Sequence, residues 1–366
     1  MTSISGEMTA TSLVPPIIAQ PVAVAPQSAL APAGPGAAEI GWIWDLMLVS
    51  GTIITLAVFA VLGVALFRRR RPDELPPEAD RPADPRGEHA NVESGGRGRE
   101  GEGRPRSERL GSRWLVGGGI VFPGVVLTVL FLFTLRTLGS IAPRPGDAAA
   151  LTVEVIGKQW WWEVRYLDED PSRIAITANE LRIPVGRRVR ILLGASDVIH
   201  SFWVPGLQGK TDMIPGRRNV TWLEADAPGR WRGQCAEFCG VQHAKMALVV
   251  VAEPQAQFDA WLERQIAPAA APADSAGRAD EAAFLASGCV LCHAVRGTPA
   301  GARLGPDLTH VASRLTLAAG ELPNTEGHLA GWIADPQSVK PGSRMPAVPL
   351  TPQELHAITR YLRSLH

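Results

Sequence analysis

The chain has few cysteines and no excess of charge of either sign. Its 366 residues contain four cysteines, and 36 basic side chains balance 36 acidic ones. A neutral chain lacks the positive surplus that favours nucleic acid, so nucleic acid is not an expected partner. The cysteines form two motifs, Cys235-x3-Cys239 and Cys289-x2-Cys292-His293, which leaves none for other disulfides or zinc sites. Both spacings are those of redox-metal sites, so we predict an electron carrier.

Positive charge is also absent from the first part of the chain. Residues 1–67 contain no Lys or Arg, and four consecutive arginines then begin at Arg68. Two uncharged runs of 22 residues, Leu46–Phe67 and Trp114–Leu135, are long enough to cross a bilayer. Both are followed by arginine, which disfavours the alternative of a buried core helix. The predicted transmembrane helices are residues 41–67 and 114–138.

The arginines predict how these helices are oriented. Residues 68–113 hold about a dozen arginines, and loops rich in positive charge stay in the cytoplasm. The rest of this Arg/Glu-rich loop has the composition of disorder. Everything after the second helix is therefore expected on the periplasmic side of a bacterial inner membrane, anchored by two passes. The Ala- and Arg-rich, Lys-poor composition is in keeping with a bacterial source.

The first 40 residues contain an apolar stretch, residues 14–24, that resembles part of a signal peptide. They lack a basic segment before it, and several prolines would interrupt a helix there. We predict a flexible N-terminal tail over residues 1–40, with a cleaved leader as the alternative.

Two further domains are expected after the second helix. Short apolar strands separated by Pro-Gly turns predict an all-β sandwich over residues 150–264. An Ala/Pro-rich stretch, residues 265–279, has the composition of a linker. Residues 280–366 have helical character, and Thr351-Pro-Gln-Glu354 has the pattern of a capping box that opens a terminal helix. The expected fold is therefore multi-domain, with a two-helix hairpin, a β-sandwich and an all-α domain.

The first cysteine motif offers an unusual set of metal donors. Cys235 and Cys239 are followed by His243 and Met246, and thiolate, imidazole and thioether together suit copper in electron transfer. His200, which follows a predicted strand, is the candidate for a second imidazole. A disulfide or a zinc site would be the alternatives, but neither gives Met246 a role.

This motif, with Glu237 between the cysteines and the stretch 200–205 before it, resembles the binuclear copper (CuA) domain of cytochrome c oxidase subunit II. The resemblance covers about residues 40–265 and implies a cupredoxin-like sandwich. It further implies that two thiolates bridge two copper ions, that two imidazoles bind at the ends, and that a thioether and a backbone carbonyl are weak ligands. The implied bridging thiolates are Cys235 and Cys239, and the implied imidazoles are those of His200 and His243. The weak ligands would be the Met246 thioether and the Glu237 carbonyl. The Glu237 carboxylate would also bind Mg²⁺ at the boundary with subunit I.

Three consecutive tryptophans occupy residues 160–162 of this predicted domain. In a strand, alternate rings point to opposite faces, so at least one of the three is not expected to be pure core. Packing between the sandwich and the membrane surface is the plainer interpretation. The resemblance instead implies that Trp160 is where electrons enter the copper domain.

The second cysteine motif predicts a covalent c-type haem. Cys289 and Cys292 would attach the porphyrin and His293 would be the proximal ligand, whereas a thioredoxin-like site lacks this histidine. Met345 is the only methionine after the motif, so we assign it as the sixth ligand. Its Pro/Gly-rich loop and the stretch 305–308 resemble class I cytochromes c. The alternative ligands, treated as surface or packing residues, are His310, His328 and His356.

Together the resemblances imply subunit II of a haem–copper terminal oxidase, with a cytochrome c domain fused at its C-terminus. Electrons would come from a soluble or membrane cytochrome c, or from a quinol-oxidising complex. They would pass from haem c to CuA and on to subunit I, where O2 is reduced to water and protons are pumped. This chain lacks histidine-bearing membrane helices for an O2 site, so it would be part of an enzyme without holding the catalytic centre.

Two other functions stay open at this point. A nitric oxide reductase that contains CuA would need the same carriers. A copper-delivery or redox-sensing protein would need exchangeable ligands, which a filled ligand set beside a covalent haem disfavours. One feature departs from the family: the second span opens at Arg113 with no carboxylate, and the nearest acid is Glu108. This departure puts proton entry through this subunit in doubt.

Overall fold

The computed structural model describes residue 24 and residues 27–68, 106–143 and 151–366. The predictions for the first 23 residues and for most of the Arg/Glu-rich loop lie outside these residues. The chain divides into two units, and one of them, residues 39–141, contains the apolar helices. The other contains residues up to 38 and from 142 to 366.

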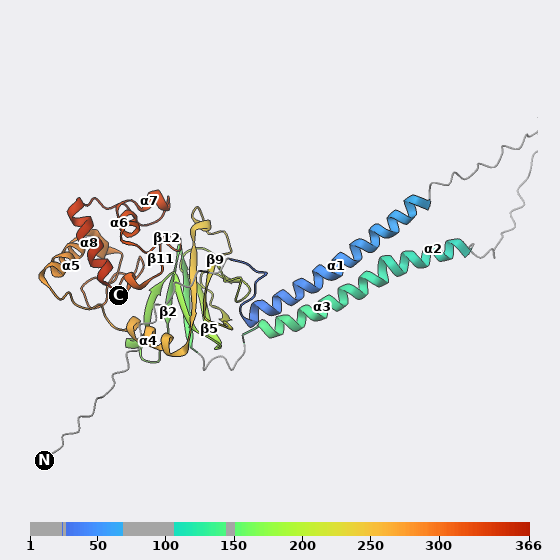
Figure 1. The fold of residues 1–366 in the computed structure, drawn as a ribbon, viewed down its shortest axis with the longest axis horizontal. Coiled ribbons are helices and arrows are strands. Elements are labelled where there is room, and N and C mark those ends of the chain that lie inside the picture. The colour runs from blue at the N-terminus through green and yellow to red at the C-terminus, as the bar shows by residue number, and fades with distance from the viewer. Residues whose placement is uncertain (1–23, 25–26, 69–105, 144–150) are drawn as a thin grey trace, which may run out of the picture. The chain divides into compact units, whose positions relative to one another are not determined.

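The helical unit consists of two long apolar helices. The first is α1, Pro35–Arg68, and the second is continuous through α2, Arg106–Val116, a π-helical turn η1, Gly117–Val121, and α3, Phe122–Ile141. By length and composition, 35–67 and 111–141 are each able to cross a membrane, and their most apolar windows are not buried inside the protein. The rings of Trp42 and Phe133 lie 5.3 Å apart, so α1 and α3 run side by side (Figure 1).

The second unit begins with a sandwich of two five-stranded sheets, ordered β3-β2-β1-β5-β8 and β4-β10-β9-β6-β7. Neighbouring strands are antiparallel except for the pairs β1–β5 and β4–β10. The strands are β1 Thr152–Lys158, β2 Trp161–Tyr166, β3 Ala175–Ala178, β4 Glu180–Pro184, β5 Val189–Ala195, β6 His200–Trp203, β7 Thr211–Met213, β8 Asn219–Leu223, β9 Gly229–Cys235 and β10 Ala247–Glu253. The predicted all-β sandwich is confirmed.

Alternating side chains form the core between the two sheets. Val153 and Val155 in β1 and Ile191 and Leu193 in β5 are fully buried, and the alternate residues of β1 are partly exposed. In β5, Leu192 on the other face is 8% exposed. This period of two follows from strand geometry, and removing these apolar side chains from water stabilises the sandwich. The helix α4, Gln255–Ile266, and the short turn η3, Pro171–Arg173, complete this domain.

The last domain is built mainly of helices. Its termini pack together, because α5, Ser275–Ala286, and α8, Pro352–Ser364, bring the rings of Phe284 and Tyr361 to 5.2 Å. The predicted capping box at Thr351 and Glu354 is present. The remaining elements are η5 Gly288–Leu291, η6 Val311–Ser313, α6 Glu326–Ala334, α7 Pro336–Val339 and a two-stranded ladder, β11 Thr316–Leu317 with β12 Leu322–Pro323. This ladder is the one departure from an all-α domain.

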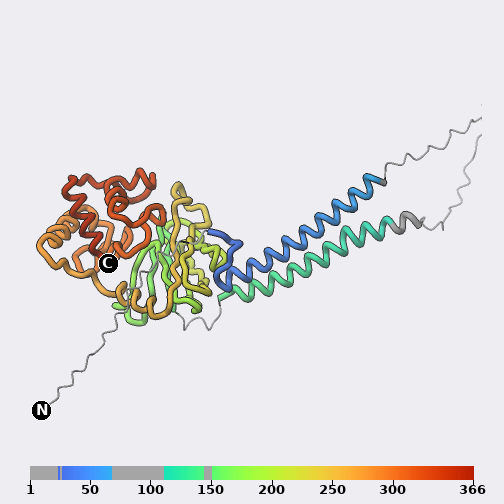
Figure 2. Tube along the Cα trace, viewed as in Figure 1, coloured from blue at the N-terminus to red at the C-terminus, as the bar shows by residue number. Residues whose placement is uncertain are grey.

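The sandwich and the mainly helical C-terminal domain are in direct contact (Figure 2). Glu180 at the start of β4 accepts a hydrogen bond from the backbone N–H of Leu315 at 2.9 Å. At the start of β10, the N–H of Ala247 donates to the carbonyl of Ala319 at 3.0 Å. These contacts place the helical domain against the second sheet.

The segment just before α1 is bonded to the sandwich. The N–H of Ala33 donates to the carbonyl of Gly206 at 2.7 Å, and the N–H of Asp226 donates to the carbonyl of Ala33 at 3.0 Å. A Cβ at Gly34 would lie 2.1 Å from the carbonyl oxygen of Glu224, so only glycine allows this close approach. The predicted tail, residues 1–40, thus ends in a segment held by backbone hydrogen bonds.

Candidate copper and haem sites

The first cysteine motif lies where strands of one sheet end together. Cys235 is the last residue of β9, and His200 is the first residue of the neighbouring strand β6. The chain then turns back through η4, His243–Lys245, to enter β10. The sheet order therefore brings His200 next to a motif that follows it by 35 residues in sequence.

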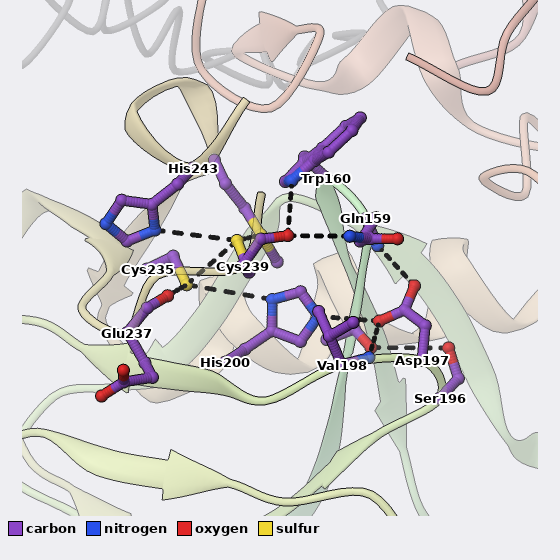
Figure 3. A network of polar contacts seen from close by, with 12 residues as sticks. Gln159, Trp160, Ser196, Asp197, Val198, His200, Cys235, Glu237, Cys239 and His243 are labelled. Carbon is purple, nitrogen blue, oxygen red and sulfur yellow. Dashed lines mark hydrogen bonds and ion pairs between the residues drawn. The ribbon is translucent and has the colours of Figure 1, made fainter. Parts of the chain in front are cut away.

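Five of the predicted copper ligands have side-chain donors that converge here (Figure 3). The two sulfurs, Sγ of Cys235 and Sγ of Cys239, are 3.7 Å apart. His200 Nδ1 lies 3.8 Å from the first sulfur, and His243 Nδ1 lies 3.6 Å from the second. The Met246 sulfur is 3.8 Å from the Cys239 sulfur. The donors thus form one cluster with an imidazole at each sulfur.

Both cysteines are free and buried, so no disulfide occupies the site. Contact with the Cys239 sulfur lowers the pKa of Cys235, and the same contact raises the pKa of Cys239. Two thiolates this close repel each other, so without a cation the pair keeps a proton. A bound cation removes that proton, because metal coordination requires the thiolate form.

Glu237 contributes to the cluster through its backbone. Its carbonyl oxygen lies 3.2 Å from Cys235 Sγ, whereas its carboxylate points away from the sulfurs (Figure 3). The side chain is exposed. The two roles predicted for Glu237, a carbonyl donor to copper and a carboxylate donor to Mg²⁺, thus fall on opposite sides of the residue.

The imidazole of His200 is oriented by Asp197. His200 Nε2 lies 2.8 Å from Asp197 Oδ1, which leaves Nδ1 facing the sulfur. Burial opposes the charged ring, but the contacts with Asp197 and Cys235 together outweigh it and raise the pKa of His200. The other carboxylate oxygen of Asp197 accepts from the N–H of Gln159 at 2.7 Å. A carboxylate behind a ligating histidine fixes the ring and increases its basicity.

Trp160 is tied directly to a cysteine of the cluster. Its indole Nε1 donates to the carbonyl oxygen of Cys239 at 3.0 Å, and the ring is 9% exposed. The neighbouring rings alternate: Trp161 is partly exposed beneath the Lys158 ammonium, while Trp162 is fully buried against Phe202. Trp160 therefore belongs to the sandwich core and is bonded to the backbone of the cysteine cluster.

The second cysteine motif forms a tight turn. Cys289 lies in η5, and its carbonyl accepts from the N–H of Cys292 at 3.1 Å and of His293 at 3.0 Å. The His293 Nδ1 lies 2.7 Å from the Pro306 carbonyl, which makes Nδ1 the donor and leaves Nε2 free to bind iron. Burial lowers the pKa of His293, so the ring is held in the neutral form that a metal requires. A Cβ at Gly305 would lie 2.6 Å from this ring.

Met345 lies on a separate loop after α7. Gln337 organises this loop, because its Nε2 donates to the Met345 carbonyl at 2.8 Å and its Oε1 accepts from the N–H of Gly342 at 2.8 Å. His310 is buried and bonded to backbone carbonyls, whereas His328 and His356 are exposed. The role of Met345 as sixth haem ligand stays a prediction.

Three supporting residues were missed in the sequence. Asp197 stands three residues before His200, and Pro306 lies in the stretch 305–308 that resembles a cytochrome c. Both residues therefore belong to segments that the sequence motifs had already indicated. Lys340 donates to the carbonyl of Trp160, which precedes it by 180 residues. Its only signal in the sequence is the rarity of lysine.

The fold and the site define a cupredoxin-like domain with a cysteine–histidine cluster, joined to a mainly helical domain that carries the Cys-x2-Cys-His motif. Family models agree: residues 166–253 match "Cytochrome C oxidase subunit II, periplasmic domain", and residues 280–366 match "Cytochrome c". A cytochrome c oxidase subunit 2 of Alkalihalophilus pseudofirmus is 35% identical over 92% of this chain and 90% of its own. One from Bacillus sp. strain PS3 is 38% identical over 66% of this chain and 69% of its own. The chain belongs to the cytochrome c oxidase subunit 2 family.

One solved structure is also similar in part. The periplasmic domain of subunit II of the cytochrome oxidase of Bradyrhizobium japonicum is 33% identical. The match covers 33% of this chain and 94% of that one, with a TM-score of 0.30.

Proposed function

We propose that this subunit feeds electrons into a haem–copper terminal oxidase. Electrons enter at a haem c held by Cys289 and Cys292, pass to binuclear CuA, and continue to subunit I for O2 reduction coupled to proton pumping. The observation that carries the proposal is the pair of free thiols 3.7 Å apart, Cys235 and Cys239, each with an imidazole Nδ1 beside it.

The donor set fits copper better than zinc. Structural zinc takes four ligands, whereas six donors converge here once the Met246 thioether and the Glu237 carbonyl are counted. Soft thiolate and thioether donors favour copper, and bound copper supplies a one-electron couple. The residues that would hold it are His200, Cys235, Glu237, Cys239, His243 and Met246. Their positions at strand ends of a rigid sandwich keep the ligands nearly fixed when the charge changes.

The haem domain fits a six-coordinate c-type haem. Cys289 and Cys292 would form the thioether bonds, and His293 is already oriented by the Pro306 carbonyl. Met345 would be the sixth ligand, which raises the reduction potential relative to two histidines. Trp160 would be the last side chain before copper, because its indole N–H bonds to the backbone of Cys239.

The two apolar helices would anchor the subunit as a two-pass membrane protein. The Arg/Glu-rich segment between them would lie in the cytoplasm, and both metal domains in the periplasm. Subunit I and other oxidase subunits would bind beside the copper cluster, with Mg²⁺ at the exposed Glu237 carboxylate. The electron donor would be a soluble or membrane cytochrome c, or a quinol-oxidising complex.

Spectroscopy of the purified full-length chain tests the proposal. We expect a mixed-valence copper EPR signal together with the absorption of a low-spin c-type haem. A copper-loaded chain without the mixed-valence signal would contradict the CuA assignment. Turnover of the purified complex with O2 separates an oxidase from a nitric oxide reductase.

A further inference from the structure

Lysine is rare in this chain, and three of its four lysines lie at the junction between the sandwich and the cytochrome c domain. The four lysines are Lys158, Lys210, Lys245 and Lys340. Lys158 and Lys245 in the sandwich donate hydrogen bonds to carbonyls of the cytochrome c domain. Lys340 in the cytochrome c domain donates to a carbonyl of the sandwich. Lys210 differs, because it is about half exposed and pairs with Asp212. The junction between the domains is therefore where this chain uses the compact ammonium group, which points three donors in different directions.

Lys340 is the lysine that joins the domains most closely. It follows α7 in the cytochrome c domain and is 3% exposed. Its Nζ donates to the carbonyl oxygens of Trp160 at 2.8 Å, Lys245 at 2.7 Å and Ala318 at 3.2 Å. Three acceptors use all three N–H donors of an ammonium group. Two acceptors belong to the sandwich and one to the cytochrome c domain, so a single side chain bonds to both.

Both acceptors on the sandwich adjoin the candidate copper cluster. The indole of Trp160 donates to the Cys239 carbonyl, and Lys245 lies between His243 and Met246 in sequence. The ammonium group of Lys340 therefore bonds to the backbone of two segments that adjoin the cluster, at Trp160 and at Lys245.

On the cytochrome c side, Lys340 is linked to the Met345 loop. Gln337 in α7 accepts from the N–H of Gly342 and donates to the carbonyls of Ser343 and Met345, all at 2.8 to 2.9 Å. Because one side chain braces three positions, the loop moves together with α7. A displacement of Lys340 would therefore displace the candidate haem ligand relative to the copper cluster.

Neighbouring contacts at this junction are also polar. Gln242 donates to the Pro341 carbonyl at 2.6 Å, and Lys245 donates to the Val339 carbonyl at 2.5 Å. Burial lowers the pKa of Lys340 to about 8, which shows how far the ammonium is withdrawn from water. A buried charge is costly unless all its donors are paired, so these bonds favour one docked geometry over others.

We propose that Lys340 is a positioning residue that latches the cytochrome c domain onto the copper-binding end of the sandwich. The proposal rests on the proposed function, and adds that haem-to-copper transfer depends on this one docked arrangement. In this arrangement the Lys340 ammonium lies against the Trp160 carbonyl, where the two domains meet.

Hydrogen–deuterium exchange of the purified oxidase tests the latch without reference to its cofactors. We compare the native subunit with Lys340→Met, which keeps the length of the side chain and removes its donors. Lys210→Met is the matched control. In Lys340→Met we expect faster exchange in peptides that cover Trp160 and Lys245, by about tenfold, and no change in the control. Peptides from β1 and α8 report whether each domain stays folded. Loss of protection there as well would mean that Lys340 supports the fold rather than the junction, and would overturn the proposal.

Rapid-reaction spectroscopy of the same proteins then follows the haem-to-copper step after the haem is reduced. We expect this step to slow about tenfold in Lys340→Met, with the haem spectrum and the copper EPR signal unchanged. Lys340→Arg, which keeps the charge, should recover part of the rate. An unchanged rate in Lys340→Met would overturn the latch and leave the proposed function intact. Absence of the step in the native protein would instead contradict the proposed function, while the exchange experiment would still decide on the latch.

Discussion

Trp160 donates a hydrogen bond from its indole nitrogen to the carbonyl oxygen of Cys239, at 3.0 Å. This bond links an aromatic ring at the domain junction to the backbone of a predicted copper ligand. It also explains why the ring is buried although it precedes the first residue of β2.

Trp160→Phe keeps the aromatic ring and removes this hydrogen bond. We expect the transfer of electrons into copper to slow about tenfold, because the ring is no longer held against the cysteine backbone. The rate after rapid reduction of the haem measures it. Trp161→Phe is the control, since Trp161 is partly exposed and contacts Lys158 rather than the cluster. Equal rates in the two variants would remove Trp160 from the route.

Asp197→Asn removes the charge behind His200 while keeping a similar shape. We expect copper affinity to fall about 10- to 100-fold, because the carboxylate that orients the imidazole is lost. Competition with a copper chelator measures the affinity. The control is Asp226→Asn, an exposed aspartate three residues after the end of β8. If both variants bind copper as tightly as the native protein, the hydrogen bond does not support the site.

Gly305→Ala tests how His293, the predicted haem ligand, is held. A Cβ at this position would lie 2.6 Å from Cε1 of His293, so the ring or the backbone must shift. We expect haem to remain attached through Cys289 and Cys292, with a smaller low-spin fraction in the visible spectrum. Gly301→Ala is the matched control, because a Cβ there meets nothing within 4 Å. A native spectrum in Gly305→Ala would show that the close approach is not needed.

Glu253 provides a test of pH dependence. Burial raises the pKa of this carboxyl group, which lies beside Arg182 and Glu180. The folded protein then holds the proton more tightly than the unfolded chain, so this group makes stability fall as pH rises through its folded pKa. Glu253→Gln should therefore increase the free energy of unfolding at neutral pH, and change it much less in acid. Thermal unfolding at the two pH values measures the difference. A variant that is destabilised equally at both would show that the charge itself is not the cause.

Much of the fold could be predicted, because its signals are local. The short apolar strands predicted within residues 150–264 are present as β1 to β10, and the capping pattern at Thr351 predicted the start of α8. Cys235, Cys239, His243 and Met246 fall within twelve residues, so one turn and two strand ends suffice to bring them together. The ends of the apolar helices were harder to predict. Helix α1 begins at Pro35 rather than near residue 41, because the chain before it is already bonded to the sandwich.

The sequence by itself determined which donors exist and how far apart they stand along the chain, because ligand chemistry and strand periodicity are properties of short segments. Tertiary structure decided the rest. It brought His200 to a motif 35 residues away, set Asp197 behind it, and carried Lys340 over 180 residues to the carbonyl of Trp160. Such approaches depend on how two sheets and two domains pack. Packing is a sum over many weak contacts, and no single motif in the sequence records it.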